Sequence, residues 1–460
     1  MFIMKLIILT SVILCITFLT EAVPTGSLNS GVIRLPITKK HSADVLIKRG
    51  DPGSFVSDIY SIQGSEYVVH LDIGTPPQKF SVFLDICSAD LWIPSTKCDT
   101  AQCPFSRFDE TLSSTFTPTD QNFTLRYGGG NSTVTFGIDT VSFGGVTVLN
   151  QPVGLASVVK GAGILPGAIN FTLSAINTSP KALTLEDVSS NGLLGLAFIR
   201  LAEYKNSNEN NYGSLIFNMI DQKIITEPIF SVYLGNPSAL VNSGEIIFGG
   251  IDSTKYTGEL LYSPVAKTGL SDDYSSTGPL ASAYIYHTYW ATYAYSITVK
   301  DKGNAIDAKM PSDSVFMFDT GTKLSYFPLE IIVNIMDAIL GPENYGVDPR
   351  SSLFVLDCSA KNSTASIQLN MLSSHDTLNT LTINVPFGNL VFPEDGTSIE
   401  ESSICYFGIR ASMSMLTENP FTSYIIGNTI LRQLYLVYDI GQTRIGFANA
   451  IGNDITFSLS

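Results

Sequence analysis

The chain has 460 residues, of which 44% are hydrophobic and 10% are aromatic. It therefore has ample material for a buried core, and the composition excludes an intrinsically disordered protein. Charged residues make up only 15% of the chain, and the formal net charge is −15. We expect no binding to nucleic acid, because such binding depends on clustered basic side chains.

The first residues are typical of a signal peptide. Lys5 precedes an apolar run from Leu6 to Leu19, and a small-x-small cleavage site follows over residues 20–22. The run is shorter than the ~20 residues that a membrane-spanning helix needs. We expect residues 1–22 to be removed and the product to be secreted without a membrane anchor, with a vacuole or lysosome as the alternative location.

The segment that follows is basic, although the chain as a whole is acidic. Residues 23–49 hold five basic residues and one acidic residue, and they end at the dibasic pair Lys48-Arg49. Opposite charges attract such a segment to the acidic body until cleavage separates them. We interpret residues 23–49 as a propeptide, with a disordered basic linker as the alternative.

Short runs of β-branched and aromatic residues, broken by Gly, Asn and Pro, predict strands along the rest of the chain. The clearest runs cover residues 66–74, 79–84 and 434–439. Helical periodicity is scarce, and residues 212–221 and 328–340 are the better candidates for short helices. The sequence therefore predicts an all-β protein.

The cysteine spacing favours two local disulfides in an exported protein. Once the signal peptide is removed, Cys98 would pair with Cys103 and Cys358 with Cys405, which leaves Cys87 as an odd thiol. Five Asn-X-Ser/Thr sequons are candidate glycan sites on surface turns: Asn122, Asn131, Asn170, Asn177 and Asn362.

An internal repeat organises the body of the chain around two aspartates. An apolar strand ends at Asp85, and a Leu-Leu-Gly sequence ends 110 residues later at Gly195. In the second half an apolar strand runs into Asp319, and an Ile-Ile-Gly sequence ends 108 residues later at Gly427. The repeat predicts two matching lobes, each of which contributes one aspartate from the end of a buried strand.

Two carboxyls that meet across a pseudo-twofold axis support a specific reaction. Both cannot ionise cheaply, so they share a proton and their pKa values separate. One carboxylate can take a proton from a bound water while the protonated partner donates to the carbonyl oxygen of a peptide bond. The reaction needs no metal or other cofactor, and the histidines, His41, His70, His287 and His375, lack metal-ligand spacing.

These features resemble the pepsin-like aspartic proteases over nearly all of residues 60–450. The resemblance also rests on further motifs: Leu91-Trp92-Ile93-Pro94-Ser95, Asn191 to Ala197, Phe248 to Asp252, Tyr289-Trp290 and Ile426-Gly427-Asn428. It implies a bilobal fold of two pseudo-twofold related, β-barrel-like lobes with few short helices. The N-terminal lobe would cover residues 50–255 and carry the flap, and the C-terminal lobe would cover residues 256–460.

The resemblance also assigns roles to individual residues. It makes Asp85 and Asp319 the catalytic pair. Residues that support this pair would be Ser88, Thr320, Gly321 and Thr322. Residues that bind substrate would be Tyr127, Gly128 and Gly129 of the flap, Trp92 behind Tyr127, Phe83 in the pocket before the scissile bond, and Tyr289 on the primed side. Each of these residues could instead have an ordinary structural role, such as that of a turn-forming aspartate or a core aromatic.

The first aspartate motif departs from the family pattern, because Ile86 and Cys87 replace the usual Thr-Gly. In the family the Thr hydroxyl bonds to the backbone of the other lobe, and Ile86 cannot do so. An unpaired buried backbone group costs about 1–3 kcal/mol, and the Cys87 side chain must occupy crowded space.

Two functions therefore stay open. The first is a monomeric acid endopeptidase that acts on peptide or protein substrates and is held inactive by its own propeptide, with Lys39 or Lys40 reaching the carboxyls. The second is a catalytically silent homologue that binds peptides in the same cleft. Cys87 as a thiol nucleophile is a remote third idea, because no histidine lies near it in the sequence.

Overall fold

The structure is a computed structural model. The residues that it describes are 31–41, 65–160, 190–204, 213–235, 244–268, 287–349, 351–373, 379–393, 402, 404–412 and 422–460. The predicted signal peptide, residues 23–30 and 42–49 of the predicted propeptide, and the sequons at Asn170 and Asn177 lie outside these ranges. No helix in the covered ranges is long and apolar enough to cross a membrane.

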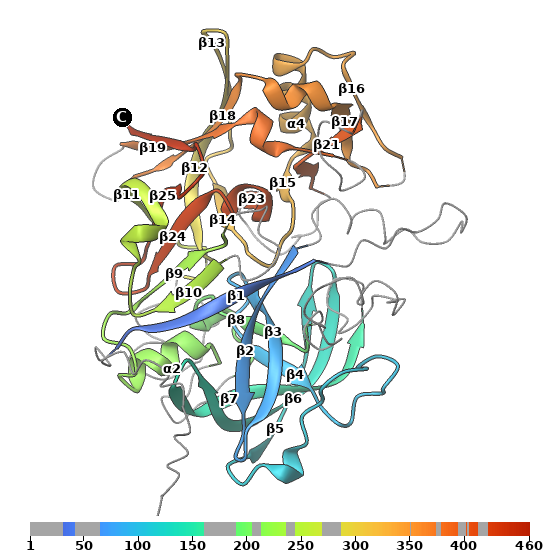
Figure 1. The fold of residues 1–460 in the computed structure, drawn as a ribbon, viewed down its shortest axis with the longest axis vertical. Helices are drawn as coiled ribbons and strands as arrows, with labels where there is room; N and C mark the ends of the chain where they lie inside the picture. Colours follow the sequence, from blue (N-terminus) through green and yellow to red (C-terminus); the bar gives the residue numbers. More distant parts are fainter. Residues whose placement is uncertain are drawn as a thin grey trace, which may run out of the picture. The chain divides into compact units, whose positions relative to one another are not determined.

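The largest sheet has 13 strands and joins elements from both halves of the sequence. Strand β9 (Ile229–Tyr233) pairs antiparallel with β24 (Leu434–Asp439), so the two halves share one hydrogen-bonded layer (Figure 1). In spatial order the strands are β11 (Tyr256–Pro264), β25 (Arg444–Ala450), β24 (Leu434–Asp439), β9 (Ile229–Tyr233), β10 (Gly244–Phe248), β1 (Ile33–His41), β2 (Ser65–Ile73), β3 (Gln78–Asp85), β8 (Leu193–Gly195), β4 (Leu91–Pro94), β7 (Val146–Lys160), β6 (Gly130–Phe143) and β5 (Thr117–Tyr127).

The second half of the chain forms two further sheets. The nine-stranded sheet runs β22 (Ile409–Ala411), β15 (Ser325–Phe327), β23 (Thr422–Ile426), β14 (Ser314–Phe318), β12 (Ala291–Asp301), β18 (Ser366–Leu372), β19 (Thr380–Pro386) and β26 (Thr456–Leu459), with β13 (Asn304–Lys309) on β12. The four-stranded sheet runs β16 (Tyr345–Val347), β17 (Phe354–Asp357), β21 (Ile404–Phe407) and β20 (Val391–Pro393). The all-β, bilobal prediction is confirmed.

Helices are short and few within the described ranges. The two predicted helices are present as α2 (Leu215–Asp221) and α4 (Leu329–Ile339). Helix α4 follows Pro328 and buries one apolar face, which is the pattern that packing against a sheet selects. The remaining helical elements are α5 (Asn428–Leu431) and the 3₁₀ turns η1 (Glu110–Leu112), η4 (Ile199–Leu201), η5 (Ser253–Lys255), η6 (Cys358–Asn362) and η7 (Phe387–Leu390).

The sequence repeat corresponds to two equivalent parallel strand pairs. In the first half β3 runs parallel to β8, and Asp85 lies opposite Gly195. In the second half β14 runs parallel to β23, and Phe318, the residue before Asp319, lies opposite Ile426. The similar spacing between aspartate and glycine in the two halves therefore has a structural cause. In each half the chain comes back to pair with the strand that leads into the aspartate.

An aromatic cluster joins the two halves beneath these strands. The fully buried Trp290 packs against Phe198 and Tyr438, with ring centroids 4.4 and 5.0 Å apart. Its indole N–H donates to the carbonyl of Leu196, at 3.0 Å. The Leu196 N–H in turn donates to the carbonyl of Asp85, at 3.0 Å. The core therefore fixes the backbone at the first aspartate.

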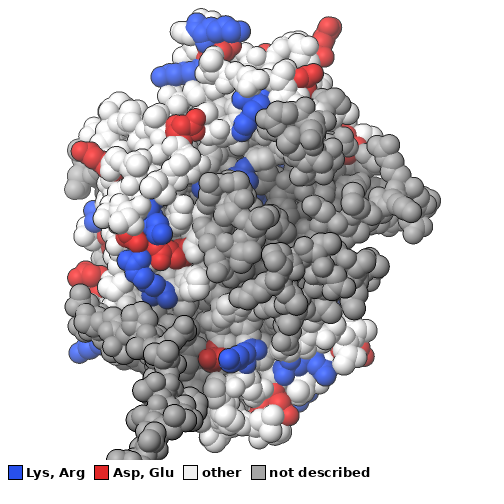
Figure 2. Space-filling model, viewed as in Figure 1, with Lys and Arg blue, Asp and Glu red and all other residues white. Residues whose placement is uncertain are grey.

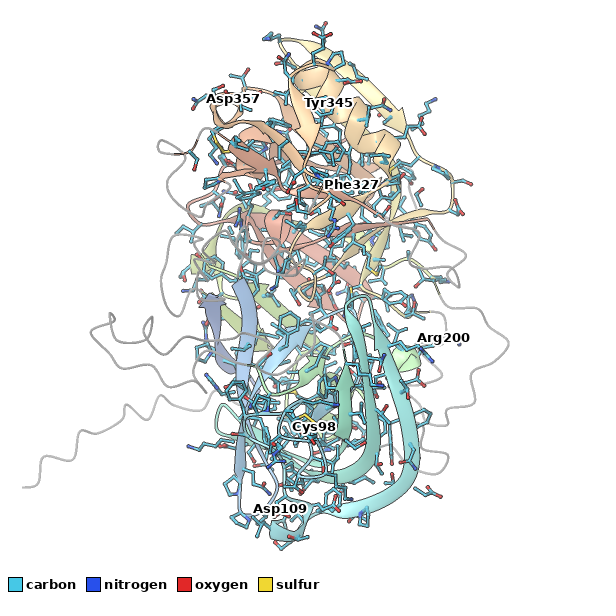
Figure 3. The ribbon with its side chains drawn as sticks, turned by 90° about the vertical axis from the view of Figure 1, so that its right-hand side faces the viewer. Cys98, Asp109, Arg200, Phe327, Tyr345 and Asp357 are labelled. Carbon is cyan, nitrogen blue, oxygen red and sulfur yellow. A yellow bond between two sulfur atoms is a disulfide. The ribbon has the colours of Figure 1, made fainter. Side chains whose placement is uncertain are left out.

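Both predicted disulfides are present, and Cys87 is not disulfide-bonded. Figure 3 shows the sulfur–sulfur bond at Cys98 among the strands of the N-terminal lobe. Acidic and basic side chains are interspersed over the described part of the face in Figure 2. The predicted lobe boundary after residue 255 coincides with the passage from η5 to β11, and it stays a prediction.

Strand β1, which comes from the predicted propeptide, lies within the largest sheet. It pairs with β10 over Ile33 to Ile37 and with β2 over Thr38 to His41. Its apolar side chains at Ile33 and Leu35 are buried, whereas Arg34 between them is exposed. The backbones of Lys39 and Lys40 lie in this strand, opposite Tyr67 and Glu66, and the described side chains do not include theirs.

Candidate active site

The first aspartate loop holds the Asp85 carboxylate through both of its oxygens. The backbone N–H of Cys87 donates to Oδ1 at 2.8 Å, and the Ser88 hydroxyl donates to Oδ2 at 2.6 Å. The carbonyl of Ser88 accepts the N–H of Ala197 at 2.8 Å, which ties the loop to the end of β8. Asp85 is only 7% exposed, so these bonds define its orientation.

The second loop repeats this arrangement around Asp319. The backbone N–H of Gly321 donates to Oδ1 at 2.7 Å, and the Thr322 hydroxyl donates to Oδ2. Asn428 fixes the loop twice, because its backbone N–H donates to the carbonyl of Thr322 at 2.8 Å and its side-chain amide donates to the carbonyl of Thr320 at 3.0 Å. Sequence reasoning had not given Asn428 a role, although the Ile-Gly-Asn motif contains it.

The two carboxyls lie beside each other, and Gly321 approaches both of them. A Cβ added at Gly321 would lie 2.9 Å from Asp85 Oδ1 and 3.0 Å from Asp319 Oδ1, so only glycine fits there without displacing the carboxyls. Burial raises the pKa of both groups, and the negative charge of Asp85 helps to raise the pKa of Asp319 to about 7. The pair can therefore hold one proton in acid solution.

Two contacts connect the aspartate loops across the lobes. The Thr320 hydroxyl donates to the carbonyl of Leu84 at 2.9 Å, and Thr320 is fully buried. At the equivalent position of the first loop, the side chain of the fully buried Ile86 has no proton to donate. The sequence therefore predicted that a backbone group of the other lobe would be left without a hydrogen-bond donor. That prediction is wrong, because the Cys87 sulfur lies 3.4 Å from the carbonyl of Phe318 and its S–H can donate to it.

The Cys87 thiol lies in an apolar cluster of the C-terminal lobe. It packs against this cluster, which contains the buried Met317, and the half-buried Tyr289 packs against the same cluster. Burial raises the pKa of this thiol well above its ordinary value, and the charges of Asp319 and Asp85 raise it further. The thiolate is the nucleophilic form of cysteine, so the environment does not support the idea of a thiol nucleophile.

A long β-hairpin, formed by β5 and β6, carries the predicted flap residues. Tyr127 lies opposite Gly130, and the exposed Gly128 and Gly129 form the turn between them. The indole N–H of the fully buried Trp92 donates to the Tyr127 hydroxyl at 2.9 Å. The structure thus joins the predicted flap tyrosine to its predicted support.

The predicted pocket aromatics pack against two different apolar clusters. Phe83 is half-buried and packs, like Tyr127, against the apolar cluster that contains Trp92. Tyr289 packs against the same apolar cluster as Cys87, and its pKa is raised by burial and by the nearby charges, including those of both aspartates. Burial and the charges of Asp90 and Asp85 raise the pKa of Tyr127, so both tyrosines lie near the carboxyl pair.

One buried carboxylate beside the site escaped the sequence analysis. Asp90 accepts the backbone N–H groups of Glu203 and Tyr204, at 2.9 and 3.3 Å, and its own carbonyl accepts the N–H of Gly195 at 3.0 Å. A buried aspartate that bonds backbone amides stabilises a loop. Only its place directly after the first aspartate motif could have suggested this role.

Comparison with known proteins identifies the same architecture. A family model described as eukaryotic aspartyl protease matches residues 66–450. Mucorpepsin from Rhizomucor miehei is 29% identical over 391 residues, which cover 85% of this chain and 79% of that protein. Human gastricsin is 28% identical over 386 residues, covering 84% and 81%, and pepsin B from Canis lupus familiaris is 28% identical over 385 residues, covering 84% and 81%.

Proposed function

The chain belongs to the eukaryotic aspartyl protease family, and from that premise we propose that it is an acid endopeptidase in which Asp85 and Asp319 are the catalytic pair. The observation that carries the proposal is that the two carboxyls lie next to the same glycine, Gly321, each oriented by a backbone N–H and a hydroxyl. Both carboxyls that the reaction needs are present.

We assign the two roles from the causes of the pKa shifts. Burial raises the pKa of both carboxyls, and the charge of Asp85 helps to raise that of Asp319 to about 7, so Asp319 would hold the shared proton and Asp85 would be the carboxylate. Asp85 would take a proton from water as that water attacks the peptide carbonyl carbon, while Asp319 donates its proton to the carbonyl oxygen. Proton return to the amide nitrogen then allows the C–N bond to break.

The surrounding residues would hold the substrate over this pair. The flap hairpin, with Tyr127 fixed by Trp92, would close over the peptide and exclude water. Phe83 and Tyr289, which pack against different apolar clusters, would line the pockets that flank the scissile bond. Aromatic walls of this kind favour apolar side chains in the substrate.

The basic segment before Arg49 would keep the enzyme inactive until acid releases it. Arg34 on β1 binds Asp252 at 2.7 Å and Glu245 at 3.2 Å. Hydrogen bonds from Thr254, together with Arg34, hold the pKa of Asp252 below its ordinary value. The ion pair is therefore complete above about pH 4 and is lost as the pH falls towards the lowered pKa of Asp252.

A silent, peptide-binding homologue is the second candidate function, because Ile86 and Cys87 replace the usual pair in the first loop. The two candidates differ in turnover and not in binding. A silent homologue would bind a pepstatin-type inhibitor and peptides in the cleft without releasing products.

Protease assays with single-carboxyl variants test the proposal. The protein processed after Arg49 should cleave denatured protein substrates in acid, and a pepstatin-type inhibitor should stop it. Asp85→Asn and Asp319→Asn should each abolish cleavage while still binding the inhibitor. Full activity in either variant would refute the assignment, and inhibitor binding without cleavage by the parent protein would establish the silent homologue.

A further inference from the structure

The two aspartate loops are joined by contacts that are equivalent in position and different in chemistry. Thr320 donates its hydroxyl proton to the carbonyl of Leu84, the residue immediately before Asp85. The equivalent acceptor in the other lobe is the carbonyl of Phe318, the residue immediately before Asp319. Position 86, the counterpart of Thr320, carries an isoleucine and has no proton to donate.

The Phe318 carbonyl is nevertheless in contact with a donor. The Cys87 sulfur lies 3.4 Å from it, a distance at which an S–H group donates a weak hydrogen bond. Phe318 is fully buried, so water cannot replace a missing partner. Since a buried acceptor without a donor is costly, this contact has a structural consequence.

The side chain at position 87 reaches this carbonyl because the two loops are not identical there. At Gly321, the counterpart of Cys87, an added Cβ would lie 2.9 Å from the Asp85 carboxyl, so that position is closed to side chains. Cys87 instead packs against the apolar cluster of the other lobe that contains Met317.

We propose that Cys87 is a positioning residue whose thiol replaces the missing threonine hydroxyl and keeps Asp85 and Asp319 in register. The replacements at 86 and 87 then compensate each other: Ile86 removes the cross-lobe donor, and Cys87 supplies another from the next residue. The kinetic part of this inference rests on the proposed endopeptidase function, whereas the hydrogen bond itself does not.

Infrared spectroscopy tests the bond without any assay of activity. In the full chain with Cys15→Ser, Cys87 is the only thiol, because the other four cysteines form two disulfides. In acid solution, where the group is a thiol, its S–H stretch should lie at lower frequency than that of a free thiol in an apolar solvent, which is the direction that donation to a carbonyl produces. A stretch at or above the frequency of a free thiol in an apolar solvent would overturn the proposal.

A mutant cycle separates a donor from a space-filling side chain. Cys87→Ala should lower kcat about two- to fivefold with little change in KM, which is the range expected from one weak hydrogen bond, and should lower the urea midpoint. Cys87→Ser keeps a donor and should recover most of kcat. In an Ile86→Thr background, where the hydroxyl is restored, Cys87→Ala should change kcat less than twofold.

The outcomes distinguish this inference from the proposed function. If Cys87→Ser loses as much as Cys87→Ala, or if Ile86→Thr does not suppress the effect of Cys87→Ala, the thiol only fills space. If the parent protein has no peptidase activity, the proposed function fails, while the infrared band and the urea midpoints of the same four variants still decide whether the thiol donates.

Discussion

The hydroxyl of Thr320 offers the sharpest test of the contact between the two lobes. Thr320→Val keeps the shape of the side chain and removes the proton that is donated to the Leu84 carbonyl at 2.9 Å. Because Thr320 is fully buried, water cannot take its place. The cost should therefore approach that of an unpaired buried acceptor, about 1–3 kcal/mol in the free energy of unfolding.

The same change should impair catalysis, because the Thr320 bond holds the strand end at Asp85 against the loop of Asp319. A displacement of about 1 Å in catalytic groups can cost on the order of a hundredfold in rate, so kcat should fall by at least tenfold with KM little changed. Urea unfolding at pH 4 and steady-state peptide cleavage measure the two effects.

Thr292→Val is the matched control for this experiment. Thr292 is also fully buried in the C-terminal lobe, but its hydroxyl contacts the sulfur of Met371 at 3.4 Å, a weak acceptor. The substitution Thr292→Val should change the free energy of unfolding by less than about 0.5 kcal/mol and leave kcat unchanged. Equal effects of the two substitutions would refute the reasoning about Thr320.

Three further outcomes are expected. Because the pKa of Asp319 is raised from 3.8 to about 7, ionising this group destabilises the folded protein. The parent protein should therefore lose stability as the pH rises from about 4 to 7, and Asp319→Asn should lose less. Equal shifts of the melting temperature in the two proteins would contradict this. Trp92→Phe removes the 2.9 Å bond to Tyr127 and should raise KM severalfold in peptide-cleavage assays, and an unchanged KM would mean that the flap needs no such support. Arg34→Gln breaks a half-exposed ion pair with Asp252, worth about 0.2–1 kcal/mol, and should speed acid release of the propeptide up to about fivefold by gel analysis; slower release would reverse the role of Arg34.

The sequence predicted the parts of the fold that repeat or alternate. The strands at 66–74 and 79–84 correspond to β2 and β3, since apolar alternation is a local signal. The repeat around Asp85 and Asp319 predicted that each aspartate comes from the end of a buried strand, and Asp85 does end β3 while Asp319 directly follows β14.

Strand β1 was not predicted, although Ile33 and Leu35 alternate with Arg34 and Pro36. Its basic residues suggested a solvated segment, and proline argues against a strand inside a sheet. Pro36 is tolerated because β1 pairs only with β10 at this point and meets β2 only from Thr38 onwards. Pairing partners far away in the sequence decided the conformation.

The contact of the Cys87 thiol could not be predicted for a similar reason. Residue types at 86 and 87 showed that a donor was lost and a side chain gained. Only the packing of two lobes, whose aspartates are 234 positions apart in the sequence, brings that side chain to the Phe318 carbonyl. The residue type at position 87 determined that a thiol is present, and the tertiary structure determined that the Phe318 carbonyl is its partner.

The pH dependence of kcat/KM for the processed protein tests the central claim most directly. A pair that shares one proton should be active only between its two pKa values, so the rate should be highest in acid and should fall as the pH approaches 7, where Asp319 loses its proton. Asp319→Asn should show no cleavage at any pH. A rate that continues to rise above pH 7, or cleavage that survives in Asp319→Asn, would contradict catalysis by Asp85 and Asp319.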